Sequence, residues 1–275
     1  MKIQRFAAFC DGDTGGNPAG VVLCAALPDA ARMQATAAEV GYSETVFAAP
    51  ADGGWRVRYF SPEVEIPFCG HATIALGAAL ALQDGDGVFA LQLNDGSITV
   101  DGRRAGALIA ASLQSPPTRS APASALVVAE ASCLFSFSAD DVDPALPPGI
   151  ANAGVDHLVL LLRSRARLAA MRYELEAGRT FMKTAGFATI SLIFAETPRL
   201  FHARNPFAAG GVYEDPATGA AAAALAGYLR DLDWPHGGAI EIIQGEDMGM
   251  RSCLKAQIPP EPGSSVRVSG AVRRL

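Results

Sequence analysis

Two stretches of this chain are hydrophobic on nearly every side of a helix, and short segments with strand-like patterns surround each of them. The first stretch reads "IPFCGHATIALGAAL" at 66–80, and the second reads "EDPATGAAAAALAGYL" at 214–229. A helix without a polar face must be enclosed by protein on all sides. The pattern therefore predicts two buried helices, each wrapped by its own sheet.

The first half of the chain predicts one further helix and several strands. Apolar residues recur at helical spacing over 28–40, and Gly41 is suited to end that helix. "TVFAAP" and "WRVRYF", joined by "ADGG", have the alternation and the turn of a β-hairpin. Glycine-containing turns separate three more strand candidates, near 88–93, 97–100 and 107–112. These signals indicate a mostly antiparallel sheet.

The second half repeats this arrangement after a segment rich in proline and serine. "SPPTRSAPAS" at 115–124 predicts a linker between an N-terminal lobe, 1–114, and a C-terminal lobe, 125–275. A final strand near 265–275 can pair back onto the first lobe. The strand-like runs of the second lobe are "HLVLLL", "FATISLIF", "AIEIIQ", "SCLKAQI" and "VRVSGAV". Together with the helix expected at 216–232, they predict an α+β protein of two similar lobes.

Composition and charge exclude several classes of protein. Half of the residues are hydrophobic and 18% are charged, as in globular proteins. The net charge of −6 argues against binding to nucleic acid or to an anionic membrane. The start of the chain lacks the pattern of a signal peptide, and no apolar run is long enough to span a membrane. We therefore expect a cytoplasmic protein.

The cysteines do not predict a disulfide framework or a metal site. There are five, and none lies in a CxxC pair. Cys69 and His71 are two residues apart, but the sequence shows no second pair of ligands beside them. We expect no metal.

The start of each buried helix is the place where the sequence predicts ligand binding. The first turn of a helix presents unsatisfied N–H groups and the positive end of the helix dipole, which attract a carboxylate or a phosphate. We expect the two helix starts to face one cleft between the lobes. The alternative is that Thr73, Asp215 and Thr218 only cap their helices, as such residues commonly do.

Five motifs in order along the chain resemble the phenazine-biosynthesis PhzF family. They are "NPAGVV" at 17–22, "YSET" at 42–45, "RYFSPEVEIPFCGHAT" at 58–73, "EDPATGAAAAAL" at 214–225 and "QGEDMG" at 244–249. The resemblance implies the diaminopimelate-epimerase-like fold, in which two pseudo-symmetric lobes each form a barrel-like sheet around a central helix. It also implies an isomerase that uses no cofactor, forms a homodimer and acts on a small carboxylate-bearing substrate.

The resemblance assigns roles to particular residues. Glu44 takes the position of the glutamate that moves a proton between carbon atoms, and His71 and Asp215 are the expected partners in placing substrate and relaying protons. From the residues alone, an exposed glutamate at a strand edge is the commoner reading of Glu44. The expected substrate-binding positions are Asn17, Cys69, Gly70, Ala72, Thr73, Thr218, Gly219 and Ala220.

Two features leave the reaction open. Ala220 stands where the family has serine, so a hydroxyl contact to the substrate is missing. Cys69 suggests an epimerase or racemase that pairs this thiol with Asp215, because a thiol at a helix start readily becomes a thiolate. Cys69 could also be a buried, inert side chain. A non-catalytic, metabolite-binding relative is a third reading.

Overall fold

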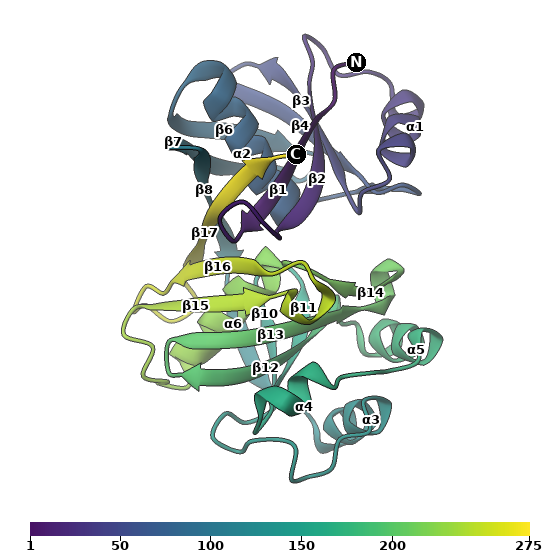
Figure 1. The fold of residues 1–275 in the computed structure, drawn as a ribbon, viewed down its shortest axis with the longest axis vertical. Coiled ribbons are helices and arrows are strands. Elements are labelled where there is room, and N and C mark those ends of the chain that lie inside the picture. The colour runs from purple at the N-terminus through teal and green to yellow at the C-terminus, as the bar shows by residue number, and fades with distance from the viewer. The chain divides into compact units, whose positions relative to one another are not determined.

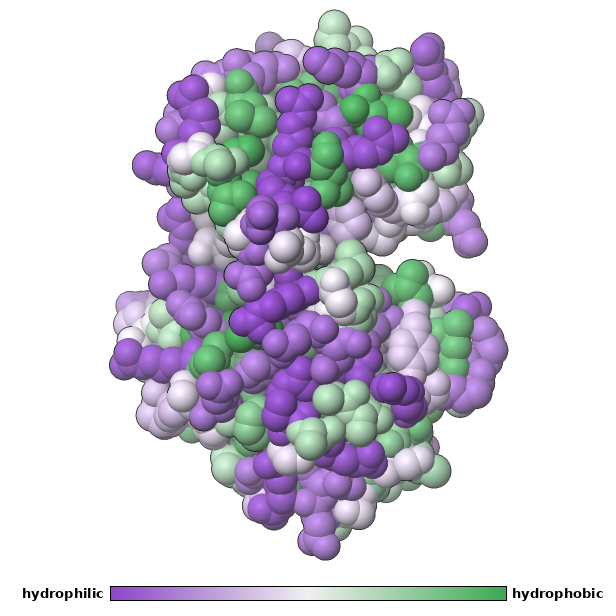
Figure 2. Space-filling model, viewed as in Figure 1, coloured by the Kyte–Doolittle hydropathy of each residue, from purple (hydrophilic) through white to green (hydrophobic).

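The computed structural model describes residues 1–275, which form two compact units (Figure 1). Unit 1 contains 1–114 together with 269–275, and unit 2 contains 115–268. No helix is long and apolar enough to cross a membrane. The face drawn in Figure 2 is mostly hydrophilic, with hydrophobic residues in small, scattered patches.

The strands of unit 1 form one sheet that closes on itself. Its strands are β1 (Gln4–Cys10), β2 (Asn17–Leu23), β3 (Thr45–Ala51), β4 (Gly54–Phe60), β5 (Glu65–Ile66), β6 (Gly87–Leu93), β7 (Gly96–Ala105), most of β8 (Leu108–Pro117) and the end of β17 (Ser265–Arg274). The β2–β3 and β4–β6 pairs are parallel, and the other pairs with a defined register are antiparallel. Because β17 pairs with both β1 and β8, the sheet has a barrel-like form.

Helix α2 (Gly70–Asp84) lies inside this sheet, as its sequence predicts. Residues 71–81 are all buried, and the helix packs against β1, β2, β3, β6 and β7. Small residues allow this close packing: a Cβ atom on Gly102 would lie 2.2 Å from the carbonyl oxygen of Gly77. Helix α1 (Ala30–Val40) covers the outside of β3 and β4 and ends at Gly41, which has the positive φ expected of a helix stop.

Unit 2 encloses a second helix, α6 (Gly219–Asp231). Residues 221–230 are buried, and the helix packs against β9, β10, β11, β15 and β16. The strands of unit 2 are β9 (Arg119–Pro122), β10 (Gly149–Asn152), β11 (Asp156–Leu161), β12 (Thr189–Thr197), β13 (Leu200–Phe207), β14 (Val212–Asp215), β15 (Ala239–Gln244) and β16 (Ser252–Gln257). The expected α+β class, with a sheet around a helix in each half, is confirmed.

The sequence pattern predicts α6 but misses the other helices of the second half. Three further helices, α3 (Ala125–Leu134), α4 (Arg165–Ala169) and α5 (Leu175–Ala185), accompany the strands of unit 2. Their apolar residues join residues of β11 and β12 in one core cluster that includes Phe135, Leu160, Met182 and Leu192. The short 3₁₀ turns η1 (Ala208–Gly210) and η2 (Glu246–Met248) complete the unit.

The proline- and serine-rich segment is structured. Residues 115–117 end β8, and β9 pairs antiparallel with β10. Ser124 caps α3 through its side chain. Proline is compatible with a strand where its nitrogen is not needed for the ladder, so this composition does not by itself imply an irregular linker.

We expect His157 to make the stability of unit 2 depend on pH. The residue is 1% exposed, its Nδ1 lies 2.7 Å from the Thr189 hydroxyl, and burial lowers its pKa to about 4. The folded protein therefore holds His157 neutral, and its contribution to stability is full above pH ~6.5 and lost as the pH falls towards 4. Between about pH 7 and pH 4, the free energy of unfolding should fall by about 3 kcal/mol less in His157→Gln than in the wild type. Urea unfolding of both proteins at the two pH values measures this difference, and equal losses would contradict it.

Candidate active site

Glu44 is a buried residue immediately before strand β3. Its carbonyl oxygen accepts a hydrogen bond from the Gly20 N–H at 3.1 Å, next to the parallel pair of Gly20 with Thr45. The close fit of Gly20 against Thr45 leaves no room for a larger residue at position 20. Glu44 is 9% exposed, so the reading of an exposed strand-edge glutamate is wrong.

Cys69 and His71 lie at the start of α2. Cys69 takes the N-cap position without capping the helix through its side chain, and His71 is the second residue of the helix. The carbonyl oxygen of Cys69 accepts hydrogen bonds from the Thr73 N–H at 3.0 Å and from the Thr73 hydroxyl at 2.7 Å. These bonds fix the turn that carries the thiol and the imidazole.

Thr73 has a structural role that sequence reasoning missed. It is fully buried, and its oxygen also lies 2.7 Å from the Tyr59 hydroxyl. Burial raises the pKa of Tyr59, so this phenol stays neutral and can donate to Thr73. Because its hydroxyl is committed in this way, we do not propose that Thr73 contacts substrate. Simple capping of α2 by Thr73 is also wrong.

The fold of unit 1 brings Glu44, Cys69 and His71 together. His71 Nε2 lies 3.2 Å from Glu44 Oε2, and His71 Nδ1 lies 3.3 Å from Cys69 Sγ. The imidazole thus stands between a carboxylate and a thiol. The approach of Nε2 to Glu44 lies outside hydrogen-bonding geometry, so this buried nitrogen has no hydrogen-bond partner. The three donor atoms are all within 4.8 Å of one another.

The other predicted residues of unit 1 are also near strand or helix starts. Asn17 opens β2 and is 1% exposed. Gly70 is the first residue of α2, and Ala72 is fully buried behind it. The Ala72 side chain is therefore placed for packing inside the barrel.

In unit 2, Asp215 and Thr218 lie where β14 leads into α6. The Thr218 hydroxyl donates to Asp215 Oδ2 at 2.5 Å rather than capping α6. Asp215, Thr218 and Ala220 are all partly exposed, whereas Gly219 is buried. These partly exposed groups are available to a ligand.

Gln244 holds this turn in place, a role that sequence reasoning missed. Its side-chain nitrogen donates to the carbonyl oxygen of Asp215 at 2.6 Å and to the Thr218 hydroxyl at 3.0 Å. Its side-chain oxygen accepts from the Thr218 N–H at 3.1 Å. The neighbouring Gly245 has a positive φ, and a Cβ atom there would lie 2.7 Å from the Pro216 carbonyl oxygen. The "QG" of the fifth motif is thus a support for the turn at 215–218.

We expect Gln244→Ala to loosen this turn. The substitution removes the three hydrogen bonds to this turn and one with Asn205, and it leaves part-buried backbone groups at 215 and 218 unsatisfied, at a cost of about 1 kcal/mol each. Hydrogen exchange of the Thr218 amide, measured by NMR, should become faster, whereas the Thr73 amide in unit 1 serves as an internal control. Unchanged protection at Thr218 would contradict this role of Gln244.

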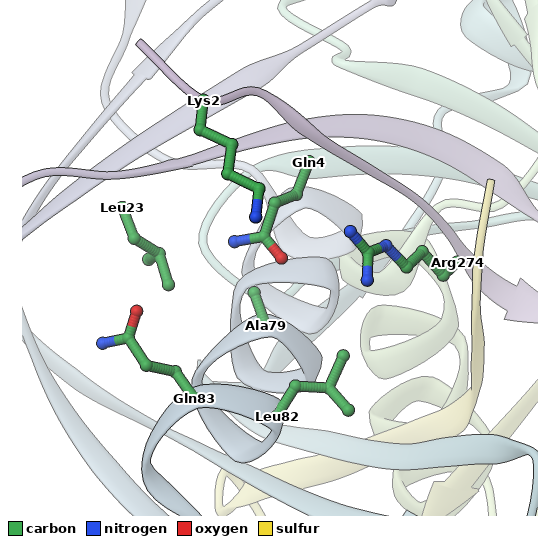
Figure 3. Close-up of a pocket in the computed structure, with 7 residues that line it drawn as sticks. All are labelled: Lys2, Gln4, Leu23, Ala79, Leu82, Gln83 and Arg274. Carbon is green, nitrogen blue, oxygen red and sulfur yellow. The ribbon is translucent and has the colours of Figure 1, made fainter.

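One surface pocket lies elsewhere in unit 1 (Figure 3). It has a volume of about 420 Å³ and is lined by Lys2, Gln4, Leu23, Ala79, Leu82, Gln83 and Arg274. Ala79 is eight residues beyond His71 in α2, which places it about 12 Å along the helix. The pocket is therefore separate from the cluster of Glu44, Cys69 and His71.

Comparison with known proteins agrees with this fold and these motifs. Residues 6–273 match the family of phenazine biosynthesis-like proteins, PhzC-PhzF. The trans-2,3-dihydro-3-hydroxyanthranilate isomerase of Pseudomonas aeruginosa is 32% identical over 96% of this chain and 93% of its own length. These matches show the family: the chain belongs to the PhzC-PhzF family and is an enzyme of the isomerase class.

Solved structures support the same fold. A PhzF-family protein of Bacillus anthracis superposes with a TM-score of 0.85 at 21% identity, covering 100% of this chain and 98% of that one. A probable proline racemase of Agrobacterium radiobacter gives a TM-score of 0.67 at 11% identity, covering 99% and 90%. The predicted diaminopimelate-epimerase-like fold is confirmed.

Proposed function

We propose that this isomerase moves a proton between carbon atoms of a small carboxylate-bearing substrate, without a cofactor, and that Glu44 is the acid/base. The observation that carries the proposal is the buried carboxyl of Glu44, 3.2 Å from the imidazole of His71. A buried carboxyl beside an imidazole is a suitable pair for general acid–base catalysis, because each group can hold the proton in turn.

In the proposed reaction, the Glu44 carboxylate removes a proton from a substrate carbon that is made acidic by neighbouring unsaturation. The electron pair of the broken C–H bond delocalises into the substrate, and Glu44 becomes neutral. The same proton, or one delivered through His71, then forms a new C–H bond at another carbon. His71 is in the first turn of α2, where the positive end of the helix dipole helps to stabilise developing negative charge.

For unit 2, we propose that Asp215 takes part in proton relay and that Thr218, Gly219 and Ala220 contribute to substrate binding. The partial exposure of Asp215, Thr218 and Ala220, and the hydrogen bonds that fix their turn, support this proposal. The backbone groups of Gly70 and of Gly219 are at helix starts suited to an anionic substrate group. Ala220 offers no hydroxyl, so we expect a substrate preference different from that of relatives with serine there.

The substrate is a carboxylic acid in this proposal, because helix starts favour anions. The first compound to test is trans-2,3-dihydro-3-hydroxyanthranilate, the substrate named for the relative of Pseudomonas aeruginosa. Related cyclic and unsaturated amino acids should follow. Incubation in D₂O with NMR detection reports deuterium at a substrate carbon. Isomerisation of a carboxylate without any added cofactor supports the proposal, and a requirement for a cofactor would reject it.

The contact of Cys69 with His71 keeps a second function open. A thiol 3.3 Å from an imidazole at a helix start is placed to form a thiolate, as an epimerase or racemase that pairs Cys69 with Asp215 requires. The two functions differ in what they need. The epimerase loses turnover in Cys69→Ala and tolerates Glu44→Gln, whereas the proposed isomerase needs Glu44.

We also propose a homodimer, on the resemblance to the family. Light scattering at about micromolar concentration tests this, since an obligate dimer would retain twice the monomer mass there. A monomeric mass would reject the proposal.

A further inference from the structure

We propose that Glu44, Cys69 and His71 form a binding site for a zinc-like divalent cation, which blocks the enzyme when it is bound. The sequence shows only two of these ligands close together, because Cys69 and His71 are neighbours while Glu44 lies 25 residues earlier. The fold supplies the third. A thiolate, an imidazole and a carboxylate are each common ligands of zinc.

The geometry suits a cation with three protein ligands. Zinc bonds of about 2.0–2.3 Å place tetrahedral ligand atoms roughly 3.3–3.8 Å apart. One imidazole offers only one nitrogen to an ion, and with one ligand atom from each residue the three atoms lie within 4.8 Å of one another. The shorter contacts, 3.3 Å from Sγ to Nδ1 and 3.2 Å from Nε2 to Oε2, involve different nitrogens of the His71 ring. The imidazole would have to turn so that one of its nitrogens faces both Sγ and the Glu44 carboxylate, which would then close the three ligands around one ion. Water would take the fourth position, as it does in zinc sites with three protein ligands.

The state of His71 Nε2 is an independent reason to expect a ligand. His71 is 4% exposed, and its Nε2 has no hydrogen-bond partner although Glu44 is only 3.2 Å away. A buried nitrogen without a hydrogen bond costs free energy, and a metal bond would satisfy it. Cys69 and Glu44 are each 9% exposed, so neither residue is completely closed off from solvent.

The net charge of the bound ligands and the hydrogen bonds that hold the Cys69 turn also favour metal binding. Binding of a dication would release the thiol proton to solvent and leave a neutral set of Cys69 thiolate, Glu44 carboxylate and metal, so no net charge is buried. The two hydrogen bonds from Thr73 to the Cys69 carbonyl hold the turn that carries the sulfur. Outer contacts of this kind strengthen metal sites by keeping the ligands in place.

Inhibition of the enzyme follows because the ion would bind the two groups that the proposed reaction needs. A bound cation takes the lone pairs of Glu44 and His71, so neither could accept a proton. This part of the inference rests on the proposed function of Glu44. Binding itself does not, since it needs no substrate and no turnover.

Cobalt titration of the untagged, chelator-treated full-length protein tests the site. Co²⁺ bound through Cys69 should give one equivalent of binding with a sulfur-to-cobalt charge-transfer absorption, which Zn²⁺ should displace. We expect Cys69→Ser to abolish that absorption, and Glu44→Gln and His71→Asn to weaken Zn²⁺ binding by roughly 10–100-fold or more. Cys133→Ser is the matched control, because Cys133 is the exposed thiol that would bind metal adventitiously.

Absence of one-equivalent binding in the wild type would overturn the inference, as would an unchanged cobalt spectrum in Cys69→Ser or a lost one in Cys133→Ser. Near-ultraviolet circular dichroism checks that each variant is folded. If Cys69→Ser does not fold, Glu44→Gln decides, because it preserves side-chain shape and removes the anionic ligand. Binding without inhibition of isomerisation would confirm the site and count against Glu44 as acid/base, so the two proposals can fail separately.

Discussion

Replacement of Glu44 by glutamine is expected to lower the isomerisation rate by about 10²–10⁴-fold, the usual contribution of a general acid/base. Glutamine has the same shape as glutamate, so it can remain beside His71 and keep the start of strand β3 in place. It cannot accept a proton from carbon. The loss should therefore fall on the rate of turnover and on deuterium exchange at the substrate carbon, while substrate binding changes little.

The matched control for this substitution is Glu39→Gln, which removes a carboxylate from the exposed side of α1 and should leave the rate unchanged. His71→Asn gives a second measurement, since it removes the relay while leaving Glu44. Full activity in Glu44→Gln would reject the proposed role. If Cys69→Ala were inactive at the same time, the epimerase that uses Cys69 would be the better account.

The enclosed helices were the part of the fold that sequence could predict most directly. Residues 71–81 and 221–230 lack a polar face, and burial on all sides is the one arrangement that satisfies them. The outer helices were missed for the opposite reason. Helix α3 reads "ALVVAEASCL", whose apolar residues lie on several sides and include two valines, so its pattern does not separate helix from strand.

The candidate site could be predicted as a set of residues but not as a geometry. The motifs name Glu44, Cys69 and His71, yet nothing in the sequence places the carboxyl of residue 44 beside the imidazole of residue 71. That proximity depends on the parallel pairing of β2 with β3 and on α2 starting next to it. Gln244 shows the converse case, because it lies within a recognised motif while its function depends on three hydrogen bonds to a distant turn.

The buried ion pair of Arg204 and Glu214 should produce the largest loss of stability. Arg204 is 5% exposed and Glu214 is 6% exposed. Arg204 Nε donates to Glu214 Oε1 at 3.0 Å, and Arg204 Nη2 donates to Glu214 Oε2. Arg204 also donates to the carbonyl oxygen of Ala169 at 3.0 Å. Removing one partner leaves the other charge buried without compensation, which costs about 3–5 kcal/mol. We expect this loss in Glu214→Gln.

The measurement can be confined to unit 2, because the two tryptophans lie in different units. Trp234 belongs to unit 2 and donates through its indole N–H to Pro198, whereas Trp55 belongs to unit 1. In a Trp55→Phe background, urea unfolding followed by fluorescence therefore reports on unit 2. The exposed pair of Lys255 and Glu241, 3.9 Å apart, supplies the control. Glu241→Gln should cost less than about 1 kcal/mol.

Stability and activity should respond together to Glu214→Gln, because Glu214 directly precedes Asp215 in β14. The backbone at Asp215 pairs with Asn205 of β13, next to Arg204, so the ion pair fixes the strand that carries the proposed relay residue. At urea concentrations well below the transition, the variant should still turn over more slowly than the Glu241→Gln control. A variant as stable as that control would show that Arg204 and Glu214 contribute no more than a surface pair.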